Sequence, residues 1–381
     1  MNYTEQRARS TSEVLRLINE LKNEIGVTRL ADITELDNIN IPVYCSYRPK
    51  AYLLQANSGK GYTHEAAKCS AMMEALEYSE FERFSEDKVV EYASYNQLKD
   101  KKILTYDNLN VQTTPFYSND TNLYWIELNN ISTEETYLCP ADMVYITNKS
   151  YIASNTNGLA SGNNNEESLL HSMYEIIERD AYAQLLTKGK LDIRKKCKRI
   201  NMETINSSII TNMTEKINNA NNLIYLMHLP SSINVYSFWC IILDNFSINP
   251  VGSFNIGLGC HADPEIAAIR AITEAAQSRL VYIHGNREDI RHKLVFNKEN
   301  GIPDNVYPFF ESLNEHSFNE LCGKESPCLK STIKQSNKQI IAELKSAGYE
   351  DIYTHILRKE EKTFSVVKTI IPGMKCESKL L

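Results

Sequence analysis

Three short stretches of this sequence combine glycines with acidic residues at similar distances. In each stretch a glutamate follows a glycine after 13 or 15 positions: Gly61 and Glu74, Gly162 and Glu175, Gly259 and Glu274. A second acid or an amide comes three residues later: Glu77, Glu178 and Gln277. Because positions i and i+3 face the same way on a helix, each pair would lie on one helical stripe. We therefore expect three helices that carry their polar stripes into one shared site.

The chemistry of such a site follows from its charges. Five carboxylates gathered in one place repel one another, so they must bind protons or cations. Mg²⁺ prefers carboxylate oxygens and usually shares them with the phosphates of a substrate. Three basic residues could balance a polyphosphate: Lys60, Arg179 and Arg270. Glycine-bearing loops before helix N-termini could offer backbone N–H groups to an anion. The residue types therefore predict a magnesium–nucleotide site.

Each of these features also has an ordinary alternative. A single acidic stripe is usually a solvated helix face, and only the threefold repetition favours a shared site. Lys60 does not stand in the phosphate-binding pattern GxxxxGK[ST]. We interpret His171 as a polar neighbour of the site rather than as a metal ligand. We interpret Cys322 and Cys328 as ordinary loop cysteines rather than as a zinc site.

The elements that must position these residues are predicted by the apolar pattern. Long helices are expected at 63–84, 166–188 and 264–284, each entered from a glycine-bearing loop. Further helices are expected at 11–25 and 334–347, strands at 41–47, 51–56, 234–244 and 363–371, and a β meander at 120–153. Because helices and strands interleave, the fold class is α+β or mixed α/β. We expect a short N-terminal helical extension, residues 1–35, followed by one catalytic domain, residues 36–381.

The composition argues against several classes of function. The chain has 381 residues, of which 42% are hydrophobic, and a net charge of −7. It can bury a full core, but it lacks the basic surplus of a nucleic-acid binder. No apolar run is long enough for a bilayer span or a secretion signal. Nine scattered cysteines without a CxxC indicate reduced thiols. We therefore expect a cytoplasmic protein with no nucleic-acid or membrane partner.

Taken together, the three stretches resemble the YcaO family, whose members activate peptide-backbone amides with ATP. The resemblance rests on Gly59-Lys60-Gly61 with 70–77, on 157–162 with 175–180, and on 257–265 with 270–289, and it runs from about 26 to 373. It implies a YcaO-like fold around a central site for ATP and Mg²⁺. By this resemblance Mg²⁺ would be held by Glu74, Glu77, Glu175, Glu178 and Glu274. The nucleotide would be contacted by Lys60, Ser70, Arg179, Arg270 and Gln277.

In that family the nucleophile decides which product forms. Residues 26–49 resemble the branch that is often paired with TfuA-type proteins. The last residues, 371–381, lack the proline-rich tail common in azoline-forming members. We therefore expect a thioamide, made with external sulfide on a ribosomally made precursor peptide or protein. An azoline-forming cyclodehydratase, a macroamidine-forming enzyme and a non-catalytic nucleotide- or peptide-binding scaffold remain alternatives. Tyr78 stands where the family usually has arginine, which removes one candidate phosphate contact.

Two further expectations concern partners and Cys260. The segment before the catalytic part is too short for a separate leader-recognition domain. Peptide recognition is therefore expected from the catalytic domain itself, or from a TfuA-like or leader-recognition partner, in a homo-oligomer. A cysteine acyltransferase using Cys260 and His261 is disfavoured, because adjacent residues seldom face each other. We interpret Cys260 as a small residue packed beside the glycines.

Overall fold

The computed structural model of the chain describes residues 7–104, 113–147, 150–187, 190–191, 193–244, 254–285, 306–359 and 363–376. The described residues form helices and several sheets, so the prediction of a mixed α/β fold is confirmed. No helix within these ranges is long and apolar enough to cross a membrane. Residues 286–289, the end of the third stretch that carries the family resemblance, lie outside the described residues.

Three sheets contain most of the described strands. The first is antiparallel, in the order β1 (Arg29–Asp32), β2 (Val43–Tyr47), β3 (Ala56–Lys60). The second has the order β13 (Phe254–His261), β12 (Tyr236–Asp244), β11 (Asn222–Leu229), β10 (Lys198–Asn201), β14 (Glu315–Ser317). The third has the order β4 (Glu91–Ser94), β5 (Asn122–Asn130), β15 (Tyr353–Arg358), β16 (Ser365–Ile370), β7 (Leu159–Gly162), with β6 (Glu135–Pro140) paired to β5. A small hairpin joins β8 (Leu186–Thr187) and β9 (Lys190–Leu191).

The three long helices begin at capping residues. They are α2 (His64–Phe81), α4 (Asn165–Ala183) and α8 (Pro264–His284). Side-chain oxygens of Thr63, Asn164 and Asp263 accept hydrogen bonds from backbone N–H groups of the first turn, which fixes where each helix starts. The shorter helices are α1 (Thr11–Glu20), α3 (Tyr95–Leu98), α5 (Ile193–Lys196), α6 (Ser208–Asn219), α9 (Val306–Glu311), α10 (Phe318–Cys322) and α11 (Ile333–Ser346).

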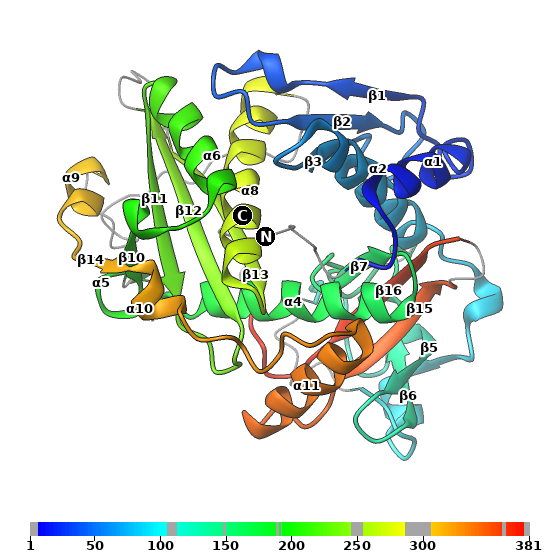
Figure 1. Cartoon of the computed structure of the whole chain (residues 1–381). Helices are drawn as coiled ribbons and strands as arrows, with labels where there is room; N and C mark the ends of the chain where they lie inside the picture. The colour runs from blue at the N-terminus through cyan, green and yellow to red at the C-terminus, as the bar shows by residue number, and fades with distance from the viewer. Residues whose placement is uncertain are drawn as a thin grey trace.

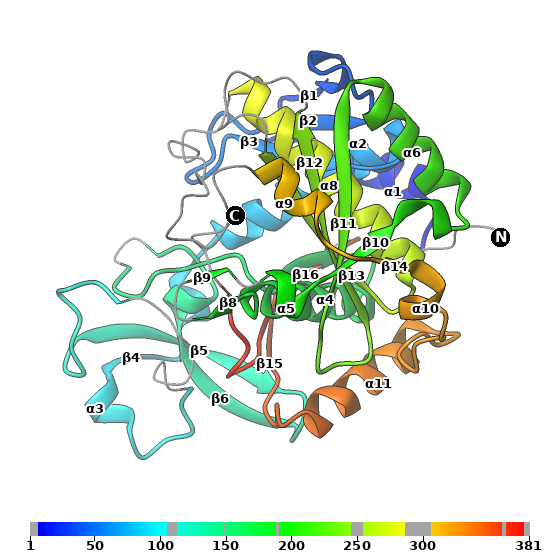
Figure 2. The same ribbon diagram turned by 90° about the vertical axis from the view of Figure 1, so that its left-hand side faces the viewer.

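Each long helix packs between two of the three sheets. α2 contacts β2 and β3 on one side and β7 on the other; α4 contacts β7 and β16 and also β12 and β13; α8 contacts β12 and β13 and also β2 and β3. Helices and sheets therefore alternate around a closed ring. Figure 1 shows the three helices bordering the middle of the molecule, with the three-stranded sheet at the top and β12 and β13 beside α8. Figure 2 shows the six-stranded sheet below the three-stranded one from a second side.

Because successive side chains of a strand point to opposite faces of a sheet, one sheet can pack against two helices. In β2, Tyr44 packs with Ala67 and Ala71 of α2, whereas its neighbours Val43 and Cys45 pack with α8. The same alternation occurs in β12. There Phe238, Cys240 and Ile242 face α8, and Trp239 and Ile241 belong to the cluster that contains the end of α4. Burial of both faces positions the helices relative to one another.

Glycines stand where the strand and the helix of one strand–turn–helix unit touch. A Cβ atom added to these glycines would lie 1.9 to 2.4 Å from a helix backbone nitrogen: Gly59 from Ala71, Gly162 from Ser168, and Gly257 from Ala275. The expectation that these three glycines lie in loops is therefore wrong, because they lie within β3, β7 and β13, whereas Gly61 follows β3 and Gly158 lies in the turn before β7. Their role in the fold is to let the helix backbone approach the strand.

Other element predictions need correction too. The expected strand at 51–56 is mostly a turn, closed by a hydrogen bond from the Arg48 N–H to the Gln55 carbonyl. The first helix ends at Glu20 rather than at residue 25. The sequence patterns missed α6 and several strands, among them β11 and β15. β11 and β15 each pair antiparallel with the strand that follows in the chain, β12 and β16, so in each case the first strand of a hairpin was overlooked.

Candidate functional site

Glu77 on α2 is held by the neighbouring unit. Its Oε1 accepts hydrogen bonds from the backbone N–H and the hydroxyl of Ser161, each at 2.7 Å. Ser161 lies in β7, directly before Gly162. Burial raises the pKa of Glu77 to about 8; the Ser161 bonds oppose this, and Glu175 and Glu74 add to it. Glu77 is therefore a half-buried acid that stays mostly protonated at neutral pH unless a cation approaches.

The stripe of α8 contacts β3 in a similar way. Glu274 forms an ion pair with Lys60 and also accepts a hydrogen bond from the Leu258 N–H at 3.2 Å. Gln277 donates its side-chain amide to the Ser58 carbonyl. Both contacts join α8 to the unit that contains α2. Lys60 thus supplies positive charge directly to one acid of the cluster.

On α4 the acids share their stripe with an arginine. Arg179 Nε lies 3.1 Å from Glu175 Oε1, yet this buried Nε–H has no hydrogen-bond partner among the described residues. Burial raises the pKa of Glu175, and it raises the pKa of Glu178 to about 8. For Arg179 the effect of burial is outweighed by Glu175, Glu178 and Glu274, so its pKa is raised. The guanidinium is thus fully charged and has donor capacity left.

Side chains of all three helices act on one another electrostatically. Glu74 of α2 and Glu175 of α4 both raise the pKa of Glu77. Glu274 of α8 raises the pKa of Glu178 on α4, and Lys60 lowers it. The expected convergence of the three stripes is therefore present in the fold. Several acids lie within reach of a few cations, without enough positive charge to ionise them all.

The fit of Mg²⁺ to this cluster depends on a second ligand source. Within the described ranges, no group of three or more His, Cys, Asp and Glu side chains is close enough to hold a metal ion alone. Phosphate oxygens would have to complete the coordination shell, which is how Mg²⁺ is usually bound. Acids with raised pKa values and an arginine with an unused N–H suit such a complex. The residues present therefore fit a magnesium–nucleotide complex better than a bare ion.

Two predicted nucleotide contacts lie at the edge of this cluster. Ser70 stands one helical turn before Glu74 on α2 and is half-buried. Arg270 is on α8, one turn before Glu274, and its Nη1 donates to the Cys260 carbonyl at 3.2 Å. Arg270 is therefore held against β13.

Sequence reasoning missed two features beside the cluster. Lys368 is a buried lysine in β16, only 2% exposed. Glu167, at the start of α4, is 3% exposed and accepts hydrogen bonds from the side chains of Asn163 and Arg7. The signal for Lys368 was a lysine within the β-branched run Ser365–Ile370, where a charged residue is out of place. Glu167 carried no comparable signal, because an acid in a first helical turn is common.

Cys260 has the environment of a structural thiol. It is fully buried, and burial raises its pKa far above the ordinary value. His261 Nδ1 accepts a hydrogen bond from the Asp263 N–H at 2.9 Å, and its ring packs against Tyr174. The imidazole nitrogen is thus engaged with backbone rather than with the thiol. This geometry argues against a Cys–His nucleophilic pair.

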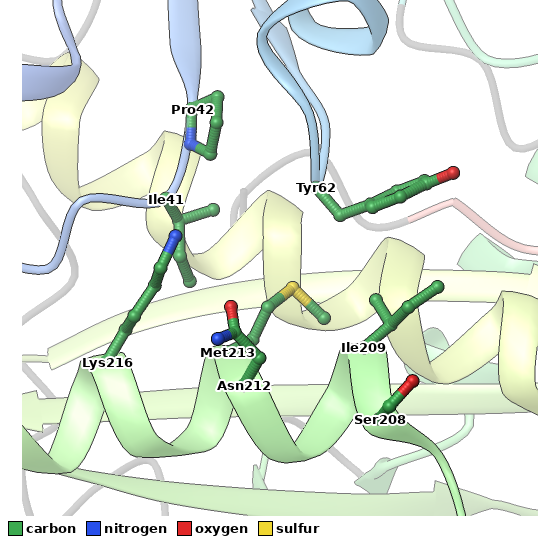
Figure 3. Close-up of a pocket in the computed structure, with 8 residues that line it drawn as sticks. All are labelled: Ile41, Pro42, Tyr62, Ser208, Ile209, Asn212, Met213 and Lys216. Carbon is green, nitrogen blue, oxygen red and sulfur yellow. The ribbon is translucent and has the colours of Figure 1, made fainter.

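A separate cavity of about 190 Å³ lies between α6 and two segments next to the three-stranded sheet (Figure 3). These segments are Ile41 and Pro42, just before β2, and Tyr62, just after β3. Its lining is largely apolar and contains none of the ten predicted site residues: Ile41, Pro42, Tyr62, Ser208, Ile209, Asn212, Met213 and Lys216. A triphosphate needs several cations, whereas this lining has one, Lys216, whose Nζ donates to the Asn40 carbonyl at 3.0 Å. The acid cluster, not this cavity, is therefore the candidate active site.

Comparisons with known proteins agree with the site's chemistry. The family model described as "YcaO cyclodehydratase, ATP- and Mg²⁺-binding" matches residues 58–375. A protein of Methanothermobacter thermautotrophicus is 32% identical over 379 residues, covering 95% of this chain and 93% of the relative. A Rhizobium leguminosarum bv. trifolii protein from the tfuA 3′ region is 30% identical over 387 residues, with 97% and 89% covered.

Solved structures show the same fold. The YcaO protein from Methanopyrus kandleri, bound with AMPPCP and Mg²⁺, aligns with a TM-score of 0.75 at 21% identity, covering 97% of this chain and 92% of that one. A heterocyclase in complex with substrate and cofactor aligns with a TM-score of 0.74 at 16% identity, covering 98% of this chain and 54% of that one. The family's description confirms the expected cofactors, ATP and Mg²⁺, at the level of the family.

Proposed function

Because this chain belongs to the YcaO family, we propose that it is an ATP- and Mg²⁺-dependent enzyme that activates a backbone amide of a peptide or protein and installs a thioamide. The observation that carries the proposal is the cluster of half-buried acids from three helices. Glu77 and Glu178 have pKa values raised to about 8, beside cations on β3 and α4. Such acids are poised to exchange protons for divalent cations when a nucleotide arrives.

The proposed roles follow the chemistry of each side chain. Mg²⁺, when bound with nucleotide, would neutralise phosphate charge and make the terminal phosphorus a better electrophile. Its ligands from this chain would be Glu74, Glu77, Glu175, Glu178 and Glu274. Arg179 would direct its unused Nε–H to a phosphate oxygen. Lys60 would exchange part of its ion pair with Glu274 for the nucleotide. Ser70, Arg270 and Gln277 would line the same nucleotide.

The reaction balances without an oxidant or a reductant. Hydrogen sulfide adds to the amide carbon, and the amide oxygen takes the terminal phosphoryl group of ATP. The C–O bond then breaks, phosphate leaves, and a carbon–sulfur double bond forms. The products are a thioamide, ADP and phosphate. The chain's own contribution is to bind and orient the nucleotide and to hold its charges in a partly desolvated place.

The choice of sulfide is supported by one relative. The Rhizobium protein lies in a tfuA region, and residues 26–49 of this chain resemble the TfuA-paired branch. A TfuA-like partner is therefore proposed to assist the reaction on a ribosomally made precursor peptide or protein. The nine cysteines are all free, which supports action in the reducing cytoplasm. We also propose a homo-oligomer, with residues 1–35 as an extension of the catalytic domain 36–381.

A substrate-independent experiment tests the proposal. Proteins extracted from source cells lacking this chain would be incubated with the purified protein, ATP, Mg²⁺ and isotopically labelled sulfide. We expect label in a protein or peptide only when ATP is present, with one oxygen replaced by sulfur in the mass spectrum. Glu178→Gln, folded by circular dichroism, should abolish the incorporation, whereas Glu127→Gln, an exposed acid on β5, should not.

The alternatives give different results in the same experiment. Loss of one water without any sulfide source would indicate azoline or amidine formation. The heterocyclase among the structural neighbours makes this the second candidate. Nucleotide binding without any modified product, in the presence of the partner protein, would indicate a scaffold. If the purified protein does not bind nucleotide at all, the assignment of the acid cluster is wrong.

A further inference from the structure

Lys368 is a buried cation that the reaction proposed above does not use. It lies in the middle of β16, is 2% exposed, and follows Val366 and Val367 in the strand. Removing an ammonium group from water costs several kcal/mol unless other groups replace the water. A leucine or valine would fill this strand position more cheaply. The lysine therefore needs an explanation beyond packing.

Its direct partners are neutral. Lys368 Nζ donates to the carbonyl of Asn155 at 2.6 Å and to the carbonyl of Asn157 at 2.7 Å, and lies 3.5 Å from Asn155 Oδ1. Across the described part of the chain, no carboxylate lies within 4 Å of this ammonium. The acidic charge that acts on it most strongly is that of Glu175. The counter-charge of Lys368 is thus the acid cluster, at longer range.

The two carbonyls belong to the turn that leads into β7. Gly158 in this turn has a φ of +75°, and a Cβ atom added to it would lie 2.3 Å from the Thr369 carbonyl oxygen. The strand that follows pairs with β16, with Leu159 opposite Lys368. Two residues further on, Ser161 holds Glu77 with both of its donors. Lys368 therefore ties down the start of the strand that positions Glu77.

We propose that Lys368 is a positioning residue of the acid cluster, which fixes the start of β7 and at neutral pH supplies a positive charge near Glu175 that favours an anionic nucleotide. This inference rests on the function proposed above. Burial lowers the pKa of Lys368 to about 8, so the ammonium is still mostly charged at pH 7. Its charge should attract the nucleotide and repel Mg²⁺, and this difference in sign can be measured.

The test uses three variants of the full chain at pH 7. Lys368→Met keeps most of the side-chain length but removes the charge and the hydrogen-bond donors, whereas Lys368→Arg keeps both. Lys345→Met is the matched control, because Lys345 also donates to a backbone carbonyl, that of Ser132 at 3.0 Å, on α11. Two quantities are measured by calorimetry: the Kd of a non-hydrolysable ATP analogue at saturating Mg²⁺, and the Mg²⁺ concentration for half-maximal binding of the analogue.

We expect Lys368→Met to weaken analogue binding about tenfold without raising the Mg²⁺ requirement. Lys368→Arg and Lys345→Met should stay within about threefold of the parent in both quantities. A Met variant that binds within twofold of the parent, or that loses affinity for analogue and Mg²⁺ by the same factor, would overturn the inference. If the Met variant does not fold, the Arg variant decides: a folded Arg variant that binds tenfold more weakly contradicts a role for the charge. A parent that binds no nucleotide refutes the proposed function instead.

Discussion

Loading the site with its magnesium–nucleotide complex should displace protons from the enzyme. Burial raises the pKa of Glu77 and of Glu178 to about 8. At pH 7 a carboxyl group with that pKa is about nine-tenths protonated. Metal ions bind the ionised form. If both groups ionise on binding, nearly two protons should leave the protein for each complex bound.

The same values give the pH dependence of the affinity. Ionising a group one pH unit below its pKa costs about 1.4 kcal/mol, so the two groups together weaken binding about a hundredfold at pH 7 relative to its limit. Affinity for the complex should therefore rise from pH 7 to about pH 8, above which loss of the Lys368 charge opposes the gain, because the pKa of Lys368 is also about 8. Proton release should fall over the same interval, because the groups are then already ionised.

The measurement is calorimetry at pH 7 in two buffers that differ in ionisation enthalpy. A preformed complex of Mg²⁺ and a non-hydrolysable ATP analogue is titrated into the protein, so that protons of the free nucleotide do not contribute. Glu77→Gln should reduce the release by about one proton, whereas Glu127→Gln on the exposed face of β5 should not change it. Binding of the complex by the parent with no proton release would refute the electrostatic account of the site.

Three further predictions follow from burial and close packing. Without divalent cations, the free energy of unfolding should fall between pH 6.5 and 8, because Glu77 and Glu178 hold protons in the folded state that they lose above about pH 4.5 when unfolded. The decrease is at most about 4 kcal/mol. A melting temperature that rises between these pH values would contradict the prediction. This window avoids His228, whose pKa burial lowers to about 4 and which acts in the opposite sense at lower pH. Gly257→Ala should destabilise the fold by more than about 3 kcal/mol in chemical denaturation, because the new Cβ would lie 2.1 Å from the Ala275 nitrogen. The control Gly348→Ala has open space around it but a φ of +93°, so it should cost only about 1–2 kcal/mol. Equal effects would show that the close contact with α8 does not determine the loss of stability. Cys260→Ala should retain most ATP-dependent activity, and intact-protein mass spectrometry during turnover should show no peptide adduct on Cys260, because its thiol is buried and its pKa raised; an acyl adduct there would overturn the phosphorylation mechanism.

Much of this site could be predicted because its signals are local. The spacing from glycine to acid and the i, i+3 pairs are properties of single helices, and the three long helices were placed to within a few residues. The helix caps at Asn164 and Asp263 added defined starting points. Helical periodicity therefore identified both the stripes and the residues on them.

What the sequence did not provide was the contacts between units. The partner of Glu77 is Ser161, 84 positions away, and the partner of Lys60 is Glu274, 214 positions away. No local pattern specifies such pairs. The glycines were misinterpreted for the same reason: a glycine in a loop and a glycine packed under a helix look alike in a sequence. Only the approach of Ala71 and Ala275 to Gly59 and Gly257 distinguishes them.

The closed ring of helices and sheets explains how the protein can keep so many acids in one place. Glu77 is held by β7 of the second unit, and Glu274 by Lys60 in β3 of the first. Each contact crosses from the helix of one unit to the strand of the next, so the cluster exists only when all three units are packed. The cost of burying acids is offset by the apolar faces that both sides of each sheet bury against the helices. The acid cluster therefore depends on the packing of all three units. The raised pKa values reflect the unfavourable free energy of placing these acids together, and a bound cation would reduce it.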